Sequence, residues 1–195
     1  PYYDFSNASE SQERSVFNRF LNNTVLKSIA DLFSEMNTYE QHLKTLDGLK
    51  AVAARQKDHP TFVYFHLLAP HQPYVMDSLA HEIPFYKIPK SNSKSGYLGQ
   101  LKGLNKLILK TVREILSHYH QPTLPVILIQ GDHGFRYLPD HPEESATILN
   151  AYLLPKGNDR LYPEISPYNT FRVLFNTYFN THLTLLGDAR PKLRK

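Results

Sequence analysis

Apolar residues recur at spacings of three and four along three stretches of the chain, and this periodicity is typical of amphipathic helices. A fourth helix is predicted to start at Ser166, because a Ser at the N-cap followed by Pro167 at the first helical position favours helix initiation. The first three predicted helices cover residues 15–33, 38–55 and 96–118. Their polar faces, including the lysines of the third, are expected to face solvent.

Three short apolar runs rich in β-branched and aromatic residues predict strands. The runs cover residues 60–68, 125–130 and 146–154. The middle run is bounded by Pro125 and Gly131, and its apolar character predicts a strand buried on both faces. Helices that alternate with such strands favour an α/β fold, so we expect three layers around a mainly parallel sheet. Three strands are few for such a sheet, which is therefore expected to be incomplete in this chain.

Composition narrows the possible classes of protein. Of 195 residues, 41% are hydrophobic, which indicates a globular chain, and the net charge of +4 gives little reason to expect a nucleic-acid partner. We expect a flexible lead-in over residues 1–14, one domain over 15–185 and a basic, solvated tail over 186–195. The chain has no cysteine, so a metal site must use His, Asp, Glu or hydroxyl ligands. No apolar run approaches the roughly 20 residues that span a bilayer.

Asp132 and His133 directly follow the middle strand and form the main candidate site. A carboxylate oxygen and an imidazole nitrogen together suit Zn or Mn. Adjacent residues of a strand point to opposite faces, so both can reach one ion only if the chain turns, which Gly131 and Gly134 permit. The alternative is a surface turn in which Asp132 caps a loop or helix.

Two further residues could act near this pair. His71 follows the strand predicted at 60–68 and would share a rim with Asp132 and His133 if the two strands were neighbours; the alternative is that it is an ordinary loop residue. A loop of about 25 residues comes after this segment. His66, inside the same apolar run, is expected to be a core histidine. Arg136 could clamp an anionic oxygen with two hydrogen bonds, or it could pair with Glu143 or Glu144.

Three segments carry a resemblance to a known family: Phe-His-Leu-Leu-Ala-Pro-His-Gln-Pro-Tyr at 65–74, Gly-Asp-His-Gly at 131–134 and Ile-Ser-Pro-Tyr-Asn-Thr-Phe-Arg at 165–172. In this order they resemble the sulfatase-like hydrolase/transferase family of the alkaline phosphatase superfamily. The likeness is to its membrane-associated branch, which includes lipoteichoic acid synthases and phosphoethanolamine transferases. It covers about residues 15–180 and corresponds to the carboxyl-terminal half of such a catalytic domain.

The resemblance implies an alkaline-phosphatase-like fold and a role for each candidate residue. Asp132 and His133 would bind a divalent metal, which could be Zn, Mn, Ca or Mg. His71 would face the phosphate or sulfate group of the substrate. Arg136 is similar to an arginine of the membrane-associated branch, although Phe135 stands where that branch is expected to have Pro.

The resemblance also implies the reaction and the place where it occurs. A metal-assisted displacement would form a covalent enzyme intermediate, whose phosphoryl or sulfuryl group passes to water or to an alcohol. Such transfer could place phosphoglycerol or phosphoethanolamine on envelope glycans or lipids, catalysed by an extracytoplasmic, membrane-anchored parent protein. The nucleophile and an acidic ligand of the family are not found here. We therefore expect this chain alone to be inactive, as a part that requires the amino-terminal half of the domain. The alternative is a non-catalytic binding module that retains the scaffold.

Overall fold

The computed structural model describes residues 38–55, 59–120, 122–138 and 140–188 of the chain. The lead-in and the helix predicted over residues 15–33 lie outside the described residues. The chain divides into two compact units, residues 1–109 and 110–195. The sequence predicts one domain over residues 15–185, and the boundary between the two units lies inside this range.

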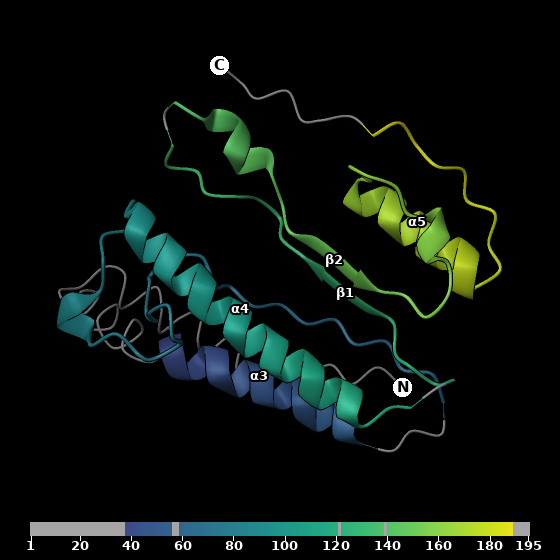
Figure 1. Ribbon diagram of the computed structural model, residues 1–195, viewed down its shortest axis with the longest axis horizontal. Helices are drawn as coiled ribbons and strands as arrows, with labels where there is room; N and C mark the ends of the chain where they lie inside the picture. Colours follow the sequence, from purple (N-terminus) through teal and green to yellow (C-terminus); the bar gives the residue numbers. More distant parts are fainter. Residues whose placement is uncertain (1–37, 56–58, 121, 139, 189–195) are drawn as a thin grey trace, which may run out of the picture. The chain divides into compact units, whose positions relative to one another are not determined.

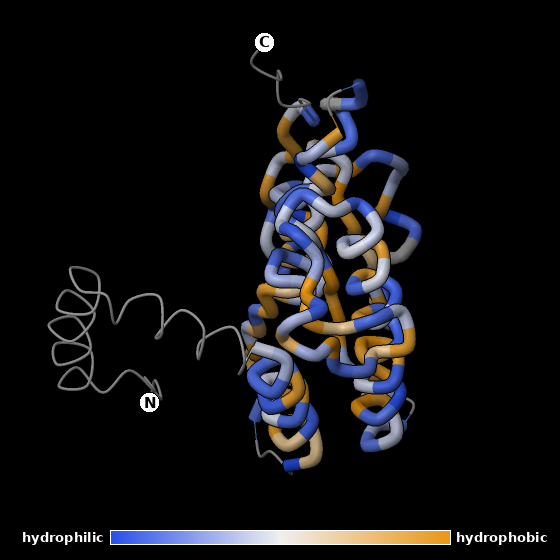
Figure 2. Tube along the Cα trace, turned by 90° about the vertical axis from the view of Figure 1, so that its left-hand side faces the viewer, coloured by the Kyte–Doolittle hydropathy of each residue, from blue (hydrophilic) through white to orange (hydrophobic). Residues whose placement is uncertain are grey.

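The first unit contains helix α3, Thr38–Ala54, the 3₁₀ helix η1, Phe85–Lys87, and most of helix α4, Lys94–Ser117 (Figure 1). The helices predicted over 38–55 and 96–118 are therefore confirmed. In Figure 2, hydrophilic and hydrophobic segments follow one another along the coiled parts of the tube, as expected for helices that bury one face. One cluster of buried residues in this unit consists of Ala69, Met76 and Leu104, with Tyr39, Leu67, Leu107 and Ile108 packed against it.

The prediction of a strand over residues 60–68 is wrong for this structure. The segment forms no strand, and its large apolar side chains are open to solvent: Phe62 is 83% exposed and Tyr64 is 79% exposed. A strand needs a neighbour for its backbone hydrogen bonds, and no described segment pairs with this one. His66 is likewise exposed rather than in a core.

The second unit contains a pair of short antiparallel strands, β1, Ile127–Gln130, and β2, Asn150–Leu153. They lie within two of the predicted runs, and Ile127 pairs with Leu153 while Gln130 pairs with Asn150. Every residue of both strands is half-buried, so the prediction that the middle strand is buried on both faces is wrong here. This pair is the only one among the described residues, and a larger, mainly parallel sheet stays a prediction.

Helix α5, Pro167–Tyr178, begins as the sequence predicts. The Ser166 side chain accepts a hydrogen bond from the Asn169 backbone N–H at 3.3 Å, which is an N-cap interaction. The fully buried Asn169 amide donates to Leu186 O and to Asp188 Oδ1, at 2.7 and 2.9 Å. Residues 186–188, predicted as the start of a solvated tail, are thus attached to α5. Two 3₁₀ helices, η2, Pro142–Ala146, and η3, Asn158–Arg160, lie in the connections. No helix among the described residues is both long enough and apolar enough to cross a membrane.

Candidate functional site

Asp132 and His133 lie in a short irregular segment directly after β1. The backbone N–H of Gly131 donates to Leu149 O, and that of Gly134 donates to Ser145 O, both at 2.9 Å. These two hydrogen bonds fasten the segment at both ends to residues 145–149, which lead into β2. The candidate pair is therefore held between two anchored points of the backbone.

The structure brings the carboxylate and the imidazole together. His133 Nδ1 lies 2.6 Å from Gly134 O, and a carbonyl oxygen can only accept, so Nδ1 carries the proton. The lone pair is then on Nε2, which lies 3.9 Å from Asp132 Oδ2. Two ligand atoms that each lie about 2.1 Å from a tetrahedral ion are about 3.4 Å apart. A small side-chain rotation would bring the pair to that separation, because the Asp132 side chain is 91% exposed.

Gly131 and Gly134, which flank the pair, do not have the role that the sequence predicts, which was to permit a turn. Neither Gly131 nor Gly134 has a positive φ, so the segment does not use their conformational freedom. Gly134 is instead required by close packing: a Cβ atom there would lie 2.1 Å from Glu144 O and 2.7 Å from Thr147 O. At Gly131 the nearest atom, Leu149 N, would be 3.6 Å away, an ordinary contact.

Arg136 extends from the same segment and is exposed. Glu143, one of the partners considered for it, is paired with His141 Nδ1 at 3.2 Å. A hydrogen bond from its own backbone and another from His141 lower the pKa of Glu143. Within the described parts of the chain, the Arg136 guanidinium forms no ion pair with either glutamate, which leaves it available to an anion. Phe135, which precedes it, is buried and meets the Tyr137 ring edge-on with ring centres 5.6 Å apart.

His71 belongs to the first unit and has its own surroundings. Its Nδ1 lies 2.8 Å from Gln72 O, so this imidazole also carries its proton on Nδ1 and exposes the lone pair of Nε2. The His71 backbone N–H donates to Leu68 O at 2.9 Å. The side chain is exposed, as a residue that meets a substrate must be.

Gln100 on α4 organises the loop around His71 and was missed from the sequence. Its side chain is fully buried, and Nε2 donates to His71 O at 2.8 Å and to Pro73 O at 3.3 Å. Its Oε1 accepts from Val75 N and Met76 N, at 2.7 and 3.4 Å. One amide thus satisfies four backbone groups of this loop. The signal in the sequence was a glutamine at a helical position between apolar residues.

The described residues contain no group of three or more His, Cys, Asp or Glu side chains placed to hold a metal ion. Asp132 and His133 offer two donor groups, whereas a catalytic zinc site needs about three from the protein. The donor types suit a divalent cation, whereas metal binding itself stays a prediction.

Comparisons of the chain with models of protein families, with curated proteins and with solved structures find no match.

Proposed function

We propose that this chain is part of a metal-dependent enzyme that hydrolyses or transfers phosphate or sulfate esters. The observation that supports it most is the geometry of Asp132 and His133: a carboxylate and an imidazole Nε2 that lie 3.9 Å apart at the end of a strand. The Nδ1 proton, fixed on a backbone carbonyl, is the arrangement usual for a metal-bound histidine. The resemblance in three segments adds the reaction class.

Each residue has a part in this proposal. Asp132 and His133 hold the cation, which when bound would withdraw charge from an ester oxygen. Arg136, exposed and unpaired with Glu143 or Glu144, can donate two hydrogen bonds to an anionic oxygen. His71 presents an Nε2 lone pair, which accepts a proton or a hydrogen bond from a substrate.

The 195 residues alone are expected to be inactive. Two ligands hold a cation weakly, and none of the residues that the structure describes has the setting of an activated nucleophile. Turnover of p-nitrophenyl phosphate or p-nitrophenyl sulfate by the purified chain, lost on Asp132→Asn, would overturn this expectation.

Metal binding is the direct test. We would measure Zn²⁺ and Mn²⁺ binding by equilibrium dialysis for the chain, for Asp132→Asn and for His133→Ala. Each substitution removes one of two ligands and should weaken binding about tenfold or more. Asp159→Asn, an exposed aspartate of the same unit, is the matched control and should bind as the unmodified chain does. Equal binding by all four proteins would refute the proposal and favour the non-catalytic binding module.

A further inference from the structure

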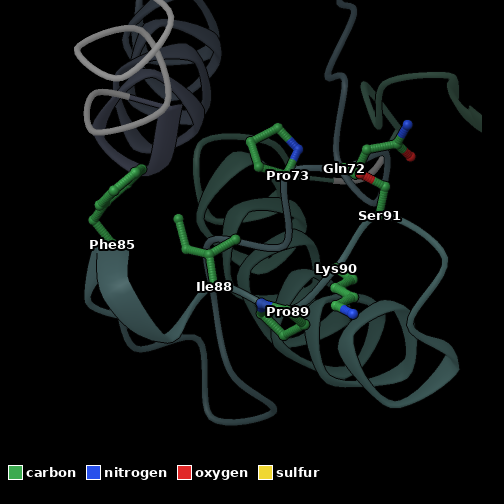
Figure 3. A pocket seen from close by; sticks show the side chains of 7 residues that line it. All are labelled: Gln72, Pro73, Phe85, Ile88, Pro89, Lys90 and Ser91. Carbon is green, nitrogen blue, oxygen red and sulfur yellow. The ribbon is translucent and has the colours of Figure 1, made fainter. Parts of the chain in front are cut away.

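A pocket of about 260 Å³ lies in the first unit, formed by Gln72 and Pro73, which follow His71, and by Phe85 and residues 88–91. Figure 3 shows its side chains, with Ile88 below Pro73 and with Gln72 and Ser91 at one side. The lining consists of Gln72, Pro73, Phe85, Ile88, Pro89, Lys90 and Ser91.

Buried residues fix both walls of this pocket. Gln100 holds the wall that contains Pro73 through its hydrogen bond to Pro73 O. Tyr74, only 1% exposed, donates from its hydroxyl to Ser91 O at 2.7 Å and so ties the second wall to the first. Gly96 on α4 packs so closely that a Cβ there would lie 2.6 Å from Tyr74 Cδ2 and 2.8 Å from Pro89 Cβ. The pocket is therefore largely formed before any ligand arrives, as small-molecule sites usually are.

The lining has a definite chemistry. Four of its seven side chains are apolar, and the other three are the Gln72 amide, the Ser91 hydroxyl and the Lys90 ammonium. Lys90 is the only charged one, and no ion pair neutralises it within the described parts of the chain. A cation beside two neutral hydrogen-bonding groups and an apolar wall suits an anionic group on an apolar body. The volume equals that of roughly nine water molecules, which is enough for a benzene ring that carries one small anionic group.

We propose that this pocket binds a small organic anion, with the anionic group at Lys90 and the apolar body against Phe85 and Ile88. Binding itself requires neither Asp132 nor a metal. The two proposals can therefore fail separately.

Phenyl phosphate is a suitable probe, because it joins an anion to an apolar ring within the allowed size. We would titrate it into the ¹⁵N-labelled, metal-free chain and follow the amide resonances. Those of Gln72, Phe85, Ile88, Lys90 and Ser91 should shift. Lys90→Met should weaken binding about tenfold, the effect of one charge-assisted hydrogen bond. The matched control is Lys87→Met in the same segment, whose ammonium lies 5.6 Å from the Tyr86 ring centre and does not line the pocket; it should keep full affinity.

Other ligands and two glycine variants test separately whether binding needs the charge, the apolar body and the shape of the pocket. Inorganic phosphate lacks the apolar body and phenol lacks the charge, so each should bind at least about tenfold more weakly than phenyl phosphate. Gly96→Ala should weaken binding by displacing Pro89, whereas Gly99→Ala, whose Cβ would come no closer than 4.0 Å to Ser78 N, should not. The proposal is overturned if the named amides do not shift, if Lys87→Met and Lys90→Met weaken binding equally, or if inorganic phosphate binds as tightly as phenyl phosphate.

Discussion

His71 and His133 make the same local hydrogen bond in two differently built loops. In each, Nδ1 donates to the carbonyl of the next residue, at 2.8 Å in the first unit and 2.6 Å in the second. The loop of His71 is held from beneath by one buried side chain, Gln100. The loop of His133 is held by backbone hydrogen bonds to Leu149 O and Ser145 O.

This difference determines how each loop can be damaged. A side-chain anchor can be removed, which leaves backbone groups without partners in the interior. A backbone anchor is not removed by changing a side chain, except to proline, which has no backbone N–H. It can be forced apart where a glycine permits close approach. The two loops should therefore respond to opposite kinds of change, deletion in one and addition in the other.

The largest effect is expected from Gly134→Ala. The added Cβ would lie 2.1 Å from Glu144 O, so the backbone must move and the anchor at Ser145 must weaken. Such overpacking should lower the free energy of unfolding by about 3 kcal/mol, measured by urea denaturation. Gly131→Ala is the matched control and should change it by less than about 1 kcal/mol, since its Cβ would meet only ordinary contacts. Similar losses in the two variants would contradict the role of close packing.

Gln100→Leu should have the next largest effect. The substitution keeps a similar side-chain volume but leaves Val75 N and the carbonyls of His71 and Pro73 without their partner. Unsatisfied buried groups should lower the free energy of unfolding by about 2 kcal/mol. Asn105→Leu, an exposed polar residue of the same helix, is the control and should be nearly neutral. The idea fails if Gln100→Leu is as stable as the control.

The sequence predicts what depends on local chemistry. Ser166 and Pro167 start α5 because an N-cap interaction involves residues only three apart. The helices at 38–54 and 94–117 follow their apolar periodicity. Both strands of the second unit also lie within apolar runs. These elements carry their main determinants in their own residues.

The remaining features depend on partners that are distant in sequence. The run at 60–68 has strand-like residues, but strand formation requires a neighbour that the described chain does not provide. Gln100 acts on residues 24 to 29 positions away, and the need for Gly134 comes from the carbonyl of Glu144. The sequence therefore identified Asp132, His133 and His71 as candidates, but not what holds their loops.

His42 should make the stability of the first unit sensitive to mild acid. This histidine of α3 is buried, its Nε2 has no hydrogen-bond partner among the described groups, and desolvation lowers its pKa below 6.5. The unfolded chain then takes up the proton more readily, so stability is present above about pH 6.5 and is lost as the pH falls below it. Urea midpoints measured between pH 7.5 and 5 should decrease, and His42→Leu should reduce the decrease. If the urea midpoint of His42→Leu decreases with pH as steeply as that of the unmodified chain, His42 is not the cause.

The second unit should respond at lower pH through Asp188. Hydrogen bonds from Ser166 and Tyr162 lower the pKa of Asp188 to about 2. A carboxylate with a lowered pKa stabilises the fold above the unfolded pKa near 3.8, and this contribution is lost as the pH falls toward 2. Thermal unfolding between pH 5 and 2.5 should therefore show a smaller decrease in Tm for Asp188→Asn than for the unmodified chain. Asp159→Asn is the control. An identical decrease in Tm in all three proteins would show that the Asp188 carboxylate does not contribute to stability in this pH range.

The smallest effect on stability is expected at the candidate site itself. Asp132 is 91% exposed, and its nearest partner is His133 Nε2 at 3.9 Å, too far for a hydrogen bond. In metal-free buffer, Asp132→Asn should change the free energy of unfolding by less than about 0.5 kcal/mol. With Zn²⁺ at 100 times its Kd, the unmodified chain should gain about 2.7 kcal/mol and the variant much less, because only a folded site binds the ion. A loss of stability without metal would instead indicate that Asp132 is part of the scaffold, whereas an equal gain with Zn²⁺ would place the ion elsewhere. A loop whose anchors lie in its glycines and backbone can present a carboxylate that the fold does not need, and such a group is free to serve a ligand.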